Sequence, residues 1–160
     1  MSNNLIDEAE FLLHLAEENS ITRLRTLLQE ATAERALPIL RRINQFYNGN
    51  NAEVLLSLAL RSFHQGQDDE AISFARRARE LKPDDHQVLR VALFFAAARG
   101  ETEDAKIVSQ RLLNLYPRDE WERTVDSKLR HEEIGSSLSA PPLQTEWERL
   151  SRIPKNNTSL

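Results

Sequence analysis

GQDDEAISFARRARELKPDD, residues 66–85, has a counterpart 34 residues later in GETEDAKIVSQRLLNLYPRD, residues 100–119. Shifted by that interval, the two stretches place Gly, Ala, Leu, Pro and Asp at equivalent positions without a gap. Each of these residues has a physical role: the Gly ends a helix where the chain turns, the small Ala lets two helices approach, and the Pro stops the second helix. A fixed period of this length is typical of repeat proteins built from stacked helical or strand units. We therefore predict a repeated helical hairpin.

The unit 52–85 resembles a tetratricopeptide repeat, a helix–turn–helix of 34 residues. Its first helix has bulky and small residues at the places of the family pattern, and so does its second, which ends in a proline. The matching residues are Leu55, Leu58, Ala59, Ala71, Ala78 and Pro83, whereas Ser62 and Ala75 replace aromatic residues. The unit 86–119 keeps Leu89, Ala92, Ala105 and Pro117. It departs at Leu93 and Leu112, where the family has small residues, so we expect its helices to sit further apart or to be rotated.

The remaining segments complete an all-α fold. A degenerate repeat at about 18–51 aligns with the next unit at an offset of 35. Apolar residues at helical spacing predict an N-terminal helix over 4–18 and a capping helix over 119–134. The resemblance thus implies a single domain, 1–134, with a tetratricopeptide-like superhelix of hairpins. Residues 135–160 form a linker and a loose tail by composition, with a short helix possible over 145–153, where Thr145 would be the N-cap.

Bulk composition narrows the classes of function. The chain of 160 residues carries a formal net charge of −4, has no cysteine and contains no apolar run of about 18 residues. The acidic balance argues against a nucleic-acid binder, and the lack of Cys excludes disulfides and thiolate metal sites. The N-terminus lacks the pattern of a secretory signal, so we expect a cytoplasmic protein without membrane insertion.

Residues with catalytic chemistry are not gathered in any recognised pattern. The four histidines, at positions 14, 64, 86 and 131, lack a metal-ligand spacing, and the four glycines do not form a phosphate-binding loop. The arginine runs at 41–42 and 76–79 are interpreted as solvated outer helix faces, with nucleic-acid binding as the alternative. We expect no enzyme activity, no cofactor, no metal site and no small-molecule substrate.

The family resemblance implies a binding site for another protein. In relatives, the first helices of successive repeats line a concave groove that holds a peptide or helix. Carried over to this chain, the groove-facing positions are Glu53, Leu56, Ser57, Leu60, Phe63, His64, Gln87, Arg90, Val91, Phe94 and Ala97. Leu56, Leu60 and Val91 stand where relatives that clamp acidic tails of heat-shock proteins have polar or basic residues. An apolar groove suits an extended apolar peptide or an amphipathic helix.

Several functional hypotheses therefore remain open. The first is an adaptor or chaperone that binds a partner's apolar segment; its plan is similar to that of type III secretion chaperones. The second is a self-assembling or obligate-subunit protein, such as a homodimer, whose apolar surface is buried. In either case the groove could be covered by the chain's own N-terminal helix or by a second copy. The letters EWER, which occur at 120–123 and again at 146–149, suggest a further alternative, in which the tail docks in the groove.

Overall fold

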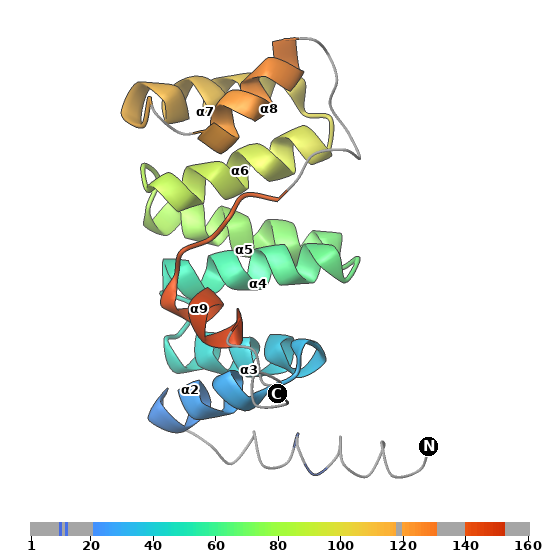
Figure 1. Cartoon of the computed structure of the whole chain (residues 1–160), viewed down its shortest axis with the longest axis vertical. Coiled ribbons are helices and arrows are strands. Elements are labelled where there is room, and N and C mark those ends of the chain that lie inside the picture. The colour runs from blue at the N-terminus through green and yellow to red at the C-terminus, as the bar shows by residue number, and fades with distance from the viewer. Residues whose placement is uncertain (1–9, 11, 13–20, 118–119, 131–139, 153–160) are drawn as a thin grey trace, which may run out of the picture.

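The computed structural model describes residues 10, 12, 21–117, 120–130 and 140–152. In this part of the chain every regular element is a helix and none is a strand. Figure 1 shows the helices between residues 21 and 130 stacked in chain order along the long axis of the molecule, and the last helix beside earlier ones. The prediction of an all-α fold is therefore confirmed.

The helices pack mainly against their neighbours in sequence, as helical hairpins do. Their bounds are α2 Ile21–Glu30, α3 Ala33–Phe46, α4 Ala52–His64, α5 Asp68–Leu81, α6 His86–Ala98, α7 Thr102–Leu115, α8 Glu120–Arg130 and α9 Glu146–Arg152. The helix predicted over 4–18 lies outside the described residues except for positions 10 and 12. Helix α8 occupies the place of the predicted capping helix, and positions 131–134 of that prediction are outside the described residues.

The 34-residue period of the sequence reappears in the helix bounds. Helices α4 and α6 are offset by 34 residues at both ends, and so are α5 and α7. Helices α3 and α5 are offset by 35 residues at both ends, as the alignment of the degenerate unit requires. The hairpins α4–α5 and α6–α7 are thus successive copies of one unit, and α3 is placed as the second helix of a preceding hairpin, α2–α3.

Equivalent glycines end the first helix of two hairpins. Gly66 and Gly100 have φ angles of 77° and 73°, a left-handed conformation that costs other residues about 1–2 kcal/mol. The residue after each glycine donates its backbone N–H to a carbonyl five residues back, Gln67 to Ser62 and Glu101 to Ala96, both at 2.9 Å. These bonds close the helix ends and turn the chain into the next helix.

Equivalent side chains also link one hairpin to the next. Arg77 on α5 donates from Nη2 to Asn50 Oδ1 at 2.7 Å. Thirty-four residues later, Arg111 on α7 donates from Nη2 to Asp84 Oδ1, also at 2.7 Å. Both acceptors lie in the connection that precedes the first helix of a hairpin. The contact between successive hairpins is therefore repeated along with the hairpins themselves.

The core differs between the two better hairpins. Ala59, Ala71 and Ala78 are fully buried at the α4–α5 contact, where small side chains let the helices approach. In the next hairpin Leu93 and Leu112 are fully buried instead. The contact between α4 and α5 is the more extensive of the two, which agrees with the expectation that the bulkier pair packs less closely.

Candidate partner-binding face

The first helices α2, α4 and α6 form one face of the stack, which we call the first-helix face. Residues Ala140–Arg152, the C-terminal segment, cross this face. Figure 1 shows the segment running past α6 and α4 and ending in α9, and α9 packs against α2 and α4. The composition of residues 135–160 predicted a loose tail, and residues 140–152 differ from that expectation. Their apolar side chains have a surface on which to be buried, which composition does not reveal.

The first half of the C-terminal segment lies on the face in an extended manner. Pro141, Leu143 and Thr145 are buried, whereas Pro142 and Gln144 between them are exposed. Such alternation is typical of an extended chain with one side against a surface. It leaves the main-chain polar groups of this part available to side chains of the face.

Two predicted groove residues hold the main chain of this extended part. Gln87 Oε1 accepts a hydrogen bond from the backbone N–H of Gln144 at 2.6 Å. Arg90 donates from Nη1 to the carbonyl oxygen of Pro142 at 3.2 Å. Because both bonds involve backbone groups, they position a polypeptide without reading its side chains.

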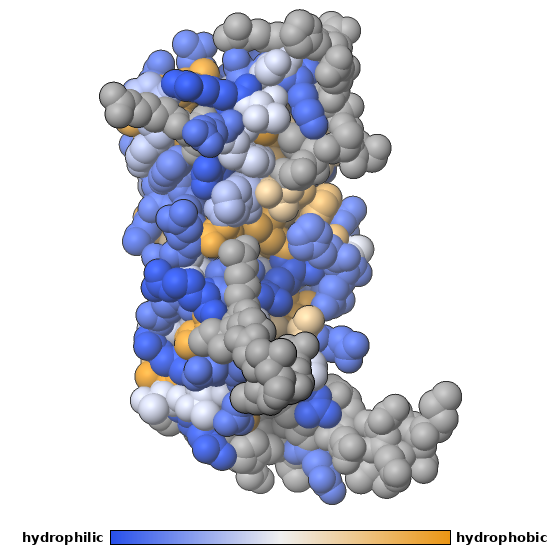
Figure 2. Space-filling model, in the orientation of Figure 1, coloured by the Kyte–Doolittle hydropathy of each residue, from blue (hydrophilic) through white to orange (hydrophobic). Residues whose placement is uncertain are grey.

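Leu143 provides the apolar anchor of the extended part. It is 2% exposed and belongs to the same buried cluster as four predicted groove residues. These residues are Leu56, Leu60, Val91 and Phe94. Phe63 packs against this cluster, with its ring centroid 5.3 Å from that of Phe94. Figure 2 shows an apolar patch within a mostly hydrophilic surface, at the level where the segment crosses between α6 and α4.

Trp147 provides the second anchor, on α9. Its side chain is 1% exposed and joins the buried cluster that contains Leu24 and Leu28 of α2. The indole ring makes an edge contact with Tyr47, at 6.1 Å between centroids, and Arg25 lies over it at 5.1 Å. The indole N–H is buried without a hydrogen-bond partner.

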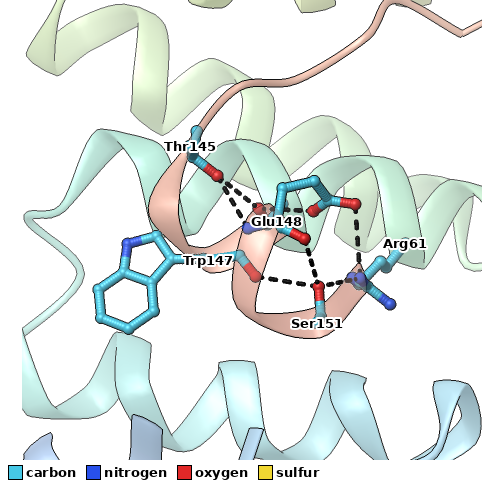
Figure 3. A network of polar contacts seen from close by, with 6 residues as sticks. Arg61, Thr145, Trp147, Glu148 and Ser151 are labelled. Atoms are coloured by element: carbon cyan, nitrogen blue, oxygen red, sulfur yellow. Dashed lines mark hydrogen bonds and ion pairs between the residues drawn. The ribbon is translucent and has the colours of Figure 1, made fainter. Parts of the chain in front are cut away.

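A polar network fixes α9 on α4 (Figure 3). Glu148 accepts a hydrogen bond from Ser57 Oγ at 3.0 Å and forms an ion pair with Arg61 at 3.4 Å. Arg61 also donates to Ser151 Oγ. Thr145 caps the helix, because its Oγ1 accepts the backbone N–H of Glu148 at 3.1 Å. In Figure 3 the Trp147 side chain points away from this network, toward the other side of α9.

Most of the predicted groove residues meet the C-terminal segment, and three do not. One group contacts the C-terminal segment or shares a cluster with it, and its members are Leu56, Ser57, Leu60, Phe63, Gln87, Arg90, Val91 and Phe94. Glu53 and His64 are exposed at the ends of α4. Ala97 is buried, at 1% exposure.

Sequence reasoning identified Arg90 but missed two other arginines that meet the segment, Arg25 and Arg61. Arg61 follows Ser57 by one helical turn, so an i,i+4 spacing would have placed it on the same side of α4. Arg25 pairs with Glu146 at 2.6 Å, and it lies in the degenerate unit, for which no groove positions were assigned. The signal for Glu148 was present in the letters TEWE, a capping-box pattern.

The arginines at 41–42 and 76–79 lie on the second helices of the hairpins, α3 and α5. Arg41 binds Glu70 at 2.9 Å, which ties α3 to α5. Arg76 and Arg79 line a pocket of about 100 Å³ together with Arg99, Glu101 and Asp104. This pocket is smaller than typical ligand sites and mixes both signs of charge. The interpretation of these arginines as parts of outer helix surfaces therefore fits their surroundings.

In the part of the chain that the structure describes, the histidines and carboxylates do not gather into a metal-binding cluster. His86 stacks on Tyr116, with 4.2 Å between ring centroids, and His14 and His131 lie outside that part. Within it, no group of three or more His, Asp or Glu side chains is placed to hold a metal ion. None of the helices described there could span a bilayer. A scan of the sequence against models of known protein families finds no match, and a search of curated proteins finds none either.

Proposed function

We propose that the chain is a non-catalytic protein-interaction module, an adaptor or chaperone of the tetratricopeptide type, that binds a polypeptide segment on its first-helix face. The observation that carries this proposal is the binding of residues 140–152 to that face. They are held by main-chain hydrogen bonds from Gln87 and Arg90 and by two buried anchors. A surface with these features accommodates a peptide, whichever chain supplies it.

The finer features of the proposal rest on the family resemblance. Repeated hairpins with matching bounds support the tetratricopeptide assignment, and the apolar anchors support a ligand with apolar side chains. A cytoplasmic chaperone of the type III secretion kind remains the more specific hypothesis within this class.

The test is capture of a partner by full-length chains that differ only at the face. Leu143→Ser/Trp147→Ala weakens binding of the C-terminal segment and frees the face. Adding Arg61→Glu reverses the charge of the face at a residue whose side chain binds Glu148 and Ser151 of the segment. We expect the first chain to retain a specific polypeptide from native lysate, quantified by mass spectrometry, and the second chain to lose it.

A lack of any difference between the two chains would refute the proposal. The controls are circular dichroism and thermal unfolding, which should show equal helix content in both.

Self-assembly is the second candidate function, and one observation favours it. Ile107 and Leu115 on α7 are 64% and 41% exposed, which is high for large apolar side chains. Light scattering after size exclusion tests this candidate: a dimer that Ile107→Lys converts to a monomer would support it, and a monomeric wild-type chain would exclude it.

A further inference from the structure

We propose that the partner of the first-helix face is a short acidic amphipathic segment with a Leu, a Trp four residues later and a Glu directly after the Trp, and that residues 140–152 are its built-in competitor. This inference rests on the proposed function and specifies its ligand.

The first argument is the division of contacts along the C-terminal segment. Gln87 and Arg90 bind backbone groups of residues 144 and 142, and such contacts accept many sequences. The side-chain contacts are made by Leu143 and Trp147, which enter two different buried clusters, and by Glu148, which enters the polar network. The residue types at these three places therefore contribute to the selectivity of this face, together with Glu146, which pairs with Arg25.

The second argument is charge. The face presents three arginines to the segment, one from each first helix: Arg25, Arg61 and Arg90. Glu146 and Glu148 of the segment pair with the first two. The Arg61–Glu148 pair is 20% and 14% exposed, so water screens it less than a surface pair. A basic partner segment would leave these arginines facing like charge, which disfavours it.

The third argument is that two contacts recur where the sequence EWER packs on the hairpins. In the EWER of α8, Trp121 packs against the apolar core beside Arg90, whose guanidinium is 5.9 Å from the ring centroid. The following Glu122 is fully buried and accepts a hydrogen bond from Ser109 Oγ. In the EWER of α9, Trp147 lies beneath Arg25 and Glu148 accepts from Ser57 Oγ.

In both places a Trp ring contacts an arginine guanidinium, and the Glu that follows the Trp accepts a hydrogen bond from a buried serine hydroxyl. The serine belongs to a second helix, α7, in one case and to a first helix, α4, in the other, so the recurrence supports a Trp followed by a Glu as a pair that these hairpins accommodate.

The fourth argument concerns the quality of the fit. Three donors at this contact are buried without a hydrogen-bond partner: Arg25 Nε, Arg61 Nε and Trp147 Nε1. Each buried donor without a partner weakens the contact. Trp147 leaves with the segment, but a partner that supplies acceptors to the two arginine Nε groups of the face would bind more tightly and displace residues 140–152 despite the advantage of their covalent connection.

The test uses the full chain and a fluorescein-labelled peptide with the sequence of residues 140–152, measured by fluorescence anisotropy. The receptor is either the wild-type chain or the chain with Leu143→Ser/Trp147→Ala/Glu148→Ala, which frees the face. We expect the freed chain to bind the peptide about tenfold or more tightly than the wild type, because in the wild type only the undocked fraction can bind.

Two control peptides separate the parts of the proposal. One carries Glu146→Lys/Glu148→Lys and keeps both anchors, and the other carries Leu143→Ser/Trp147→Ala and keeps both acidic residues. We expect each to bind the freed chain about tenfold or more weakly than the parent peptide. Equal binding of the lysine peptide would overturn the acidic specificity and leave the proposed function standing. Failure of every peptide to bind a freed chain of native helix content would overturn both.

A charge-swap pair covers the case in which the triple variant does not fold. The receptor is then the full chain with Arg61→Glu, and a peptide that carries Glu148→Lys alone should bind it better than the parent peptide does. The reverse order would overturn the proposal. A wild-type dimer that dissociates when Trp147 is replaced would also overturn it, because the segment would then belong to a second copy.

Discussion

Replacement of Trp147 by Ala tests whether residues 140–152 dock as a separate unit. A buried tryptophan removes roughly 250 Å² from water, which is worth up to about 6 kcal/mol at about 25 cal/mol per Å². The indole N–H lacks a partner, and a buried donor of this kind costs about 1–3 kcal/mol. The net loss on truncation is then about 3–5 kcal/mol.

Hydrogen exchange measured by mass spectrometry is the direct assay. The backbone N–H groups of Glu148 and Arg149 donate to Thr145, so they exchange only when α9 opens. A loss of about 3–5 kcal/mol predicts exchange that is faster by a factor of about 10² to 10⁴, up to the rate of an unprotected amide. Amides of α5 report the change in global stability, which cannot exceed the free energy of docking.

The matched control is Trp147→Phe. The phenyl ring keeps an apolar anchor and removes the unpartnered N–H, so we expect a loss below about 1.5 kcal/mol. Unchanged protection of residues 145–152 in Trp147→Ala would refute the reasoning, and so would an equal loss in the Phe variant.

Three further perturbations test the hairpins and the face. Gly66→Ala should lower the free energy of unfolding by about 1–2 kcal/mol in urea titrations through backbone strain alone, since no atom lies within 4 Å of the added Cβ; Gly66→Asn should cost less, and equal costs would contradict this origin. Arg61→Ala and Glu148→Ala should show a coupling energy of about 1 kcal/mol in a double-mutant cycle, falling in high salt; additive effects would mean that the pair contributes nothing. Ala78→Leu should destabilise by about 1–3 kcal/mol through overpacking between α4 and α5, and an unchanged midpoint would mean that this contact has room.

The hairpins could be predicted from the sequence because their signals are local. Gly66, Pro83 and their counterparts punctuate the chain at positions where helix ends need a left-handed residue or a stop. The alanines between α4 and α5 and the leucines between α6 and α7 also indicated which hairpin packs more closely. Such signals act within a few residues of the structure they determine.

The docking of residues 140–152 on the first-helix face could be predicted only in part. The residues of α4 and α6 that meet the segment followed from helical spacing, and the recurrence of EWER pointed to residues 146–149. The anchor role of Leu143 and the pairing of Arg61 with Glu148 depend on contacts between residues about 90 positions apart. No local pattern encodes such a contact, because composition describes a proline-rich stretch without describing the surface beneath it.

The buried environment of Trp147 also makes its fluorescence an intrinsic probe of whether α9 is docked. The sequence contains two tryptophans, and Trp147 is enclosed by apolar side chains, an aromatic ring and a guanidinium. With Trp121→Phe, the intrinsic emission of the chain would come from this indole alone. Release of α9 into water would shift that emission to longer wavelength, so the arrival of a competing ligand could be followed in real time without a label.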